Sequence, residues 1–361
     1  MDAHSGDLDD DLCQGRRRVT IRDVARAANV SVATVSRALS GSETVTPRTR
    51  SHVLQIAEKL DFVPHAGAQS LSLQRTDTIG VVLPDLHGEY FSELIRGLDL
   101  GARSMRQNLL LSASHGDISE AIAALRSMRS RVDGLVVMAP FADGELVGDA
   151  LKGAVPLVLL NSARSGSHAA FAVDNHAGAL AVARHLLAAG HKKIAFIGGP
   201  PDNLESQERL RGFRDAHREA GVKAGPILRG NFREESGFAA ATLLLLRGER
   251  PDAIFAANDA MALGCLHALK NAGIAVPGDV ALAGFDDIPV ARFLDPPLTT
   301  AGVPIAEMGR EAVEYCVKLV RGELTKPVHK VFAPALAVRA SSANKKGEAE
   351  RPSPSTGRVS S

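Results

Sequence analysis

Hydrophobic and polar residues follow two different patterns along this chain, with the change near residue 76. The first part carries short amphipathic patterns in which apolar residues recur three or four positions apart. From Thr78 onward, short apolar runs are separated by longer segments with helical spacing. Because short apolar runs bounded by polar or turn residues are typical of buried strands, the pattern predicts a small helical unit followed by a large α/β unit.

The small unit is predicted to contain three short helices. Thr20 is placed to cap the first, and Asn29 tolerates the left-handed backbone of the turn that follows it. Ser31 is placed to cap the second helix, and Thr46 the third, with Pro47 at its first position. Such helices predict a helix-turn-helix module whose second helix enters a DNA major groove. A plain three-helix cap on a larger domain is the alternative.

The charge distribution favours a nucleic-acid partner for this unit. The whole chain has a net charge of only +1, but residues 16–75 carry ten basic and four acidic side chains. Residues 1–15 carry five acidic side chains and neither Lys nor Arg. A basic segment on a nearly neutral body is typical of binding to a phosphate backbone. A solvated charged surface has the same composition and remains the alternative.

The large unit alternates predicted strands with predicted helices. The strands are expected within 78–84, 108–114, 133–139, 155–161, 192–199, 252–258 and 279–285. Helices are expected between them, for example at Phe91–Met105, Ile118–Met128, Ala177–Ala189, Leu204–Ala220 and Met261–Asn271. This alternation predicts parallel sheets with helices on both faces, and about 260 residues is long for one such sheet. We therefore expect an α/β core of two doubly wound parallel-sheet lobes, similar to periplasmic binding proteins.

Polar residues follow several of the predicted strands. Ligands of such sheets bind beyond the carboxyl ends of the strands, so we expect these side chains to meet in a cleft. Carboxylates, an amide and an Arg suit a polyhydroxylated ligand, because each hydroxyl donates and accepts while the guanidinium holds two acceptors. A single Asp at such a position is also a common helix N-cap. The candidate ligand-binding residues are Asp85, Tyr90, Phe91, Asp174, Arg209, Phe232, Asn258 and Asp286.

Enzymatic and cofactor motifs are missing from the sequence. There is no GxSxG elbow, no His/Cys cluster with metal-ligand spacing and no phosphate-binding loop, and "FIGGPP" lacks the GxGxxG spacing. Cys13, Cys265 and Cys316 lie far apart, as expected in a reducing cytoplasm. No apolar run approaches the ~18 residues of a membrane span, and the acidic N-terminus lacks the order of a signal peptide. We therefore expect a cytoplasmic protein that is no enzyme and needs no cofactor, rather than a periplasmic sugar-binding protein.

Several segments resemble the LacI-type transcription regulators. They are "TIRDVARAANVSVATVSRALSG", "VTPRTRSHVLQIAEKLDFVPHAGAQSL", "PDNLESQERLRGF", "IFAANDAMALG" and "ALAGFDD". The resemblance implies that Arg209, Asn258 and Asp286 contact an effector and that Leu71 wedges into the minor groove from a hinge that folds on DNA. Asn29 and Gly67 depart from the family's usual residues. The residues assigned to DNA are Thr20, Ser31, Val32, Ala33, Thr34, Ser36, Arg37, His65 and Leu71.

The resemblance implies a repressor of a carbohydrate-utilisation operon that binds a pseudopalindromic operator as a homodimer. The sequence does not distinguish a sugar, sugar acid, polyol or purine as the effector. It also does not show whether the effector acts as an inducer or as a co-repressor. The C-terminal segment lacks a leucine heptad, which favours a dimer over a tetramer. The predicted domains are a tail (1–17), the DNA-binding unit (18–63), a hinge (64–75), lobe 1 (about 76–173 and 301–329), lobe 2 (about 174–300 and 330–340) and a disordered tail (341–361).

Overall fold

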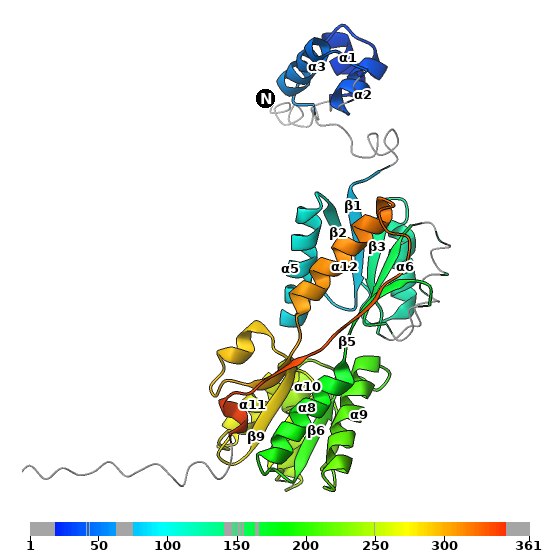
Figure 1. Ribbon diagram of the computed structural model, residues 1–361. Coiled ribbons are helices and arrows are strands. Elements are labelled where there is room, and N and C mark those ends of the chain that lie inside the picture. Colours follow the sequence, from blue (N-terminus) through cyan, green and yellow to red (C-terminus); the bar gives the residue numbers. More distant parts are fainter. Residues whose placement is uncertain are drawn as a thin grey trace, which may run out of the picture. The chain divides into compact units, whose positions relative to one another are not determined.

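The computed structural model divides the chain into two compact units that meet at residues 76 and 77 (Figure 1). We describe each unit by itself. The structure describes residues 19–40, 42, 44–62, 75–140, 147, 149, 153, 155–162, 166–248 and 250–343. Among the helices of these residues, none has the length and apolar content needed to cross a membrane.

The small unit contains the three predicted helices, packed around one apolar core. They are α1 (Ile21–Ala27), α2 (Val32–Leu39) and α3 (Pro47–Lys59). Each helix contributes one fully buried valine to that core: Val24, Val35 and Val53. The packed faces follow the apolar spacing of three or four residues: Ala38 lies three positions after Val35, Ala57 lies four positions after Val53, and both are buried.

The turns and caps of this unit follow the predicted local chemistry. The Ser31 hydroxyl accepts the backbone N–H of Thr34 at 3.0 Å, which caps α2. The Asp23 carboxylate accepts the backbone N–H of Thr20 at 2.9 Å and so satisfies a donor at the start of α1. Asn29 adopts the left-handed conformation, with φ of 53°, at the tight turn between α1 and α2.

The described part of the large unit contains two six-stranded sheets, one in each lobe (Figure 1). The first has the order β11-β5-β4-β3-β1-β2 and the second β12-β10-β9-β8-β6-β7. The strands of the first sheet are β1 (Thr78–Leu83), β2 (Asn108–Ala113), β3 (Gly134–Met138), β4 (Leu157–Leu160), β5 (Ala169–Val173) and β11 (His329–Phe332). Those of the second are β6 (Ile194–Gly198), β7 (Ile227–Arg229), β8 (Ala253–Ala256), β9 (Ala281–Asp286), β10 (Thr299–Gly302) and β12 (Ala335–Ala337).

Helices cover both faces of the first sheet, because alternate strand residues face opposite sides. On β1, Val81 belongs to the cluster that α5 (Glu89–Ser104) and α12 (Ile305–Val320) cover, and Val82 to the cluster that α6 (Ile118–Met128) covers. Helices α5 and α12 pack closely at Gly97, which has no side chain. A Cβ atom at this position would lie only 2.0 Å from a backbone oxygen of α12, so a larger residue would clash.

The second lobe packs its helices in adjacent pairs. One pair is α8 (Asn175–Ala188) with α9 (Leu204–Glu219), and the other is α10 (Glu234–Leu246) with α11 (Asp259–Asn271). Short 3₁₀ turns follow β9 and β12, at Pro289–Arg292 and Ala340–Ser342. The predicted two-lobed, doubly wound fold is confirmed, and helix Ile118–Met128 has the predicted bounds.

The structure corrects three predicted boundaries. Residues 301–302 belong to β10 in the second sheet rather than to lobe 1, because β10 pairs with β9. Residues 330–332 belong to β11 in the first sheet rather than to lobe 2, because β11 pairs with β5. The tail does not begin at residue 341, since Ser341 is buried and its hydroxyl donates to the carbonyl of Leu282 at 2.6 Å. The predicted tail 1–17 and most of the hinge 64–75 lie outside the described residues.

Candidate functional site

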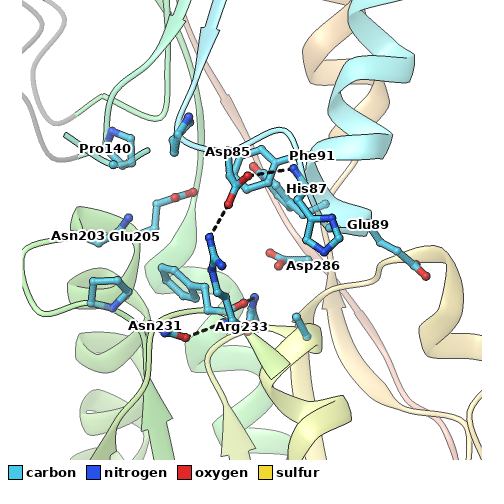
Figure 2. A pocket seen from close by; sticks show the side chains of 18 of the residues that line it. Asp85, His87, Glu89, Phe91, Pro140, Asn203, Glu205, Asn231, Arg233 and Asp286 are labelled. Carbon is cyan, nitrogen blue, oxygen red and sulfur yellow. Dashed lines mark hydrogen bonds and ion pairs between the residues drawn. The ribbon is translucent and has the colours of Figure 1, made fainter. Parts of the chain in front are cut away.

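A cavity of about 330 Å³, lined by polar and apolar groups, lies between the two lobes of the core (Figure 2). Both lobes contribute loops and helix starts that follow the carboxyl ends of their strands, which is where parallel sheets bind ligands. The predicted ligand-binding residues that line this cavity are Asp85, Tyr90, Phe91, Arg209, Phe232, Asn258 and Asp286.

Asp174, the remaining candidate, is not among the lining residues. Its carboxylate accepts the backbone N–H of Ala177 at 2.9 Å and caps α8. An Asp between a strand and a helix is well placed to cap the helix. The first N–H groups of a helix have no partner within the helix, and the Asp carboxylate accepts a hydrogen bond from one of them.

Arg209 is the centre of the cavity's buried polar network and is only 2% exposed. Its Nε donates to Asn175 Oδ1 at 2.8 Å, and its Nη1 donates to the carbonyl of Ala257 at 2.7 Å. Its Nη2 lies 3.2 Å from Asp286 Oδ1 and 3.8 Å from Glu205 Oε1. One guanidinium is therefore held rigidly by two neutral acceptors while it faces two carboxylates.

The two carboxylates beside Arg209 are both buried, so one positive charge faces two acidic groups away from water. Burial raises the pKa of Asp286 to about 7; Arg209 opposes this rise and Glu205 adds to it. Burial also raises the pKa of Glu205, again against the influence of Arg209. Desolvation outweighs the pairing with Arg209 because both carboxyls are buried, where the charged form loses its hydration.

Glu205 was not predicted from the sequence, although it lies four residues before Arg209 on the same face of α9. Its Oε1 accepts the side-chain N–H of Asn161 at 2.8 Å, and the same amide lies 3.3 Å from the Tyr90 hydroxyl. Asn161 follows β4 in the first lobe, and Glu205 lies on a helix of the second. This network therefore links the two lobes beside the cavity.

Asn258 has a supporting role in the described structure. Its Oδ1 accepts the backbone N–H of Met261 at 3.0 Å as the N-cap of α11. Its Nδ2 donates to the carbonyl of Phe232 at 2.9 Å and holds the loop that carries this ring. Phe232 and Asp286 both have left-handed φ values, 68° and 111°, which cost non-glycine residues free energy. The fold thus maintains strained backbone where two candidate residues enter the cavity.

Aromatic rings supply the apolar part of the site. Tyr90 and Phe91 make an edge-to-face contact with a centroid separation of 5.4 Å. The guanidinium carbon of Arg209 lies 3.9 Å from the centroid of the Phe285 ring and 5.7 Å from that of Phe232. Polar groups beside ring faces suit a ligand with hydroxyl edges and an apolar face.

Two further contacts connect the lobes at the cavity. Arg233 Nη2 donates to Asp85 Oδ2 at 2.7 Å, and Glu89 Oε2 accepts the backbone N–H of Val290 at 2.9 Å. Figure 2 shows the Arg233 side chain extending toward Asp85 from the loop that also carries Asn231. Nothing in the local sequence around Arg233 indicated that it would reach the opposite lobe.

The predicted DNA-facing residues lie on the surface of the small unit. Val32, Ala33 and Arg37 on α2 are exposed, while Thr34 and Ser36 are partly exposed beside them. An exposed valine and alanine next to an Arg suit contact with thymine methyl groups and a guanine edge in the major groove. The two capping residues of the set, Thr20 and Ser31, are exposed as well. His65 and Leu71 lie outside the described residues.

A helix-turn-helix unit and a two-lobed core with an interlobe cavity, joined in one chain, define a DNA-binding regulator of transcription. The chain belongs to the lacI family of bacterial regulatory proteins, whose model matches residues 20–65. A periplasmic binding protein-like domain matches residues 183–342. The chain is 37% identical over 325 residues to the HTH-type transcriptional regulator GalS of Salmonella typhimurium. The aligned region covers 89% of this chain and 96% of GalS.

Solved structures of similar proteins share this architecture. The Lac repressor dimer bound to operator and the anti-inducer ONPF has a TM-score of 0.82 at 26% identity, covering 91% of this chain and all of that one. The complex of the transcriptional regulator CelR with cellobiose has a TM-score of 0.68 at 31% identity, covering 90% of this chain and all of that one. Members of this family are transcription regulators rather than enzymes.

Proposed function

We propose that this protein is a repressor of a carbohydrate-utilisation operon that acts in the bacterial cytoplasm. Two copies bind a pseudopalindromic operator through α2, and a sugar or sugar derivative binds without chemical change between the core lobes of each copy. The observation that carries this proposal is the interlobe cavity, in which buried Arg209 and Asp286 lie beside Tyr90, Phe91 and Phe232. The Lac repressor dimer with operator and the CelR–cellobiose complex support the same assignment.

Coupling between effector and operator follows from the position of the cavity. Its walls come from both lobes, so a ligand that contacts both stabilises one lobe arrangement over others. We propose that operator binding also favours one of these arrangements; the effector then changes the operator affinity, and operator binding changes effector affinity by the same factor. Coupling free energies of this kind are about 1–3 kcal/mol, equivalent to roughly 5- to 150-fold in affinity.

The test is a titration of labelled duplexes from the region upstream of the protein's own gene. We expect one duplex to bind at least about a thousandfold more tightly than random DNA, and its affinity to change at least fivefold with one sugar. The direction of the change identifies the sugar as inducer or co-repressor. Equal binding of all duplexes contradicts the DNA assignment, and an affinity that no sugar changes contradicts the effector assignment.

Effector affinity is expected to rise as pH increases through about 7. Burial raises the pKa of Asp286 to about 7, and only the ionised carboxylate makes charge-assisted hydrogen bonds with a ligand hydroxyl. Between pH 8 and pH 6 the ionised fraction falls by about tenfold, and the affinity is expected to fall by up to the same factor. Calorimetric titrations across this range provide the measurement. Asp286→Asn is expected to bind weakly with little pH dependence, and an equal slope in both proteins contradicts the assignment.

A further inference from the structure

An ion pair crosses the cavity between the two lobes (Figure 2). Asp85 follows β1 in the first lobe, and Arg233 is the residue before α10 in the second; Arg233 Nη2 and Asp85 Oδ2 are 2.7 Å apart. The other carboxylate oxygen of Asp85 accepts the backbone N–H groups of Leu86 and His87 at 2.8 and 3.1 Å. The carboxylate is therefore fixed by its own loop, and the longer Arg233 side chain reaches across to it.

The second guanidinium of the cavity also faces carboxylates, and it is buried, whereas the Arg233 side chain is 63% exposed. Arg209 faces Asp286 and Glu205 and donates to Asn175 and the carbonyl of Ala257. The described lining residues include no lysine, so Arg209 and Arg233 are their permanent cations. Five carboxylates line the same space: Asp85, Glu89, Glu205, Glu234 and Asp286.

Helix N-termini are the other common anion-binding sites of such folds. At this cavity, acidic side chains occupy the first turns of the helices. The helices α5, α9 and α10 begin at the cavity, and the first turn of each carries a glutamate: Glu89, Glu205 and Glu234. Carboxylates at these positions compensate the positive end of the helix dipole. A helix N-terminus without an acidic side chain is a favourable site for phosphate. A glutamate in the first turn repels phosphate from that site.

We propose that Asp85 is a specificity-determining residue that, by holding Arg233, excludes effectors bearing a phosphate or carboxylate group and selects uncharged polyhydroxylated ones. This inference rests on the proposed function and refines its ligand class. An anion that drew Arg233 away would stand beside the freed Asp85 carboxylate, so its attraction to the guanidinium would be offset by repulsion at short range. An uncharged ligand leaves the pair intact and uses hydroxyl hydrogen bonds alone.

Asp85→Asn isolates this effect. The amide oxygen continues to accept the N–H groups of Leu86 and His87, while the negative charge that holds Arg233 is removed. Glu89→Gln is the matched control, because it removes one carboxylate from the same cavity wall, and Glu89 bonds to the backbone N–H of Val290 rather than to an arginine. The double variant Asp85→Asn/Arg233→Gln removes the freed cation.

The first measurement is calorimetric titration of the full-length protein and these variants with inorganic phosphate at constant ionic strength. We expect Asp85→Asn to bind phosphate about tenfold or more tightly than the unchanged protein, since a charge-assisted hydrogen bond becomes available. The double variant is expected to match the unchanged protein, and Glu89→Gln, which removes a carboxylate but frees no arginine, is expected to gain clearly less than Asp85→Asn. No gain in Asp85→Asn, or an equal gain in Glu89→Gln, overturns the inference.

The second measurement is the change in melting temperature caused by matched sugars, such as galactose with galacturonate and glucose with glucose 6-phosphate. The unchanged protein is expected to respond to the uncharged member of a pair, and Asp85→Asn to gain a response to the anionic member. A stronger response of the unchanged protein to the anionic member overturns the inference. If no sugar of either kind has an effect, the carbohydrate assignment fails, while the phosphate titration still decides the role of Asp85.

Discussion

Arg209→Ala is expected to destabilise the core by about 3–5 kcal/mol and to abolish the response to effector. The guanidinium is 2% exposed, and its removal leaves the buried carboxylates of Asp286 and Glu205 without a cation. Removing one partner of a buried ion pair costs about 3–5 kcal/mol, because the remaining charge has neither its partner nor the water that would solvate it. Urea unfolding followed by circular dichroism at pH 8 measures the loss.

The pH dependence of that loss distinguishes an electrostatic cause from lost packing. Arg209 lowers the pKa of both carboxylates, so its removal allows them to take up protons at a higher pH. Protonated carboxyls cost less to bury, and the destabilisation is therefore expected to be clearly smaller at pH 5 than at pH 8. Arg211→Ala, on the exposed side of the same helix, is the control and is expected to cost less than about 1 kcal/mol. Equal losses in the two variants contradict the central role of Arg209.

Arg37→Ala is expected to weaken operator binding by about 10- to 100-fold and to reduce the preference for operator over random DNA. Arg37 is exposed on α2 beside Ala33 and Thr34, and we propose that it reads a guanine edge. A bidentate base contact of this kind contributes about 1–3 kcal/mol of discrimination. Fluorescence anisotropy with operator and random duplexes at one fixed salt concentration gives both affinities.

Arg26→Ala provides the control for charge alone. This side chain is 83% exposed on α1 and lies 3.7 Å from Asp23, so its removal lowers the charge of the unit by the same amount. We expect a modest loss that is similar for operator and random DNA. If Arg37→Ala has the same uniform loss, Arg37 contacts phosphate rather than a base.

The elements that the sequence predicted well are those whose signals are local. Helix α6 has the predicted bounds, and α9 begins at the predicted Leu204, because apolar residues at helical spacing follow residues that cap a helix. Helix α10 was not predicted, because leucines and alanines occur on all its sides and give no periodic pattern. The short strand β12 was missed for another reason: its three residues become a strand only by pairing with β10.

The candidate site shows the same division between local and distant signals. Arg209 and Asp286 were recognised within motifs, but Asp174 was assigned to the cavity although it caps α8, since a strand-end carboxylate serves either purpose. Glu205 lies one helical turn from Arg209, and that spacing was a usable signal. Arg233 had none, because its partner Asp85 is 148 positions away.

The sequence by itself determined the helix-turn-helix unit, the alternation of strands and helices, and the residue types available to a polar cavity. Those features depend on burial periodicity and capping, which act over a few neighbouring residues. Only the tertiary structure decided where the chain passes between lobes, which two carboxylates share Arg209, and that Arg233 is held by Asp85. Such pairings depend on which strand ends meet in space, and residue spacing along the chain carries little information about that geometry.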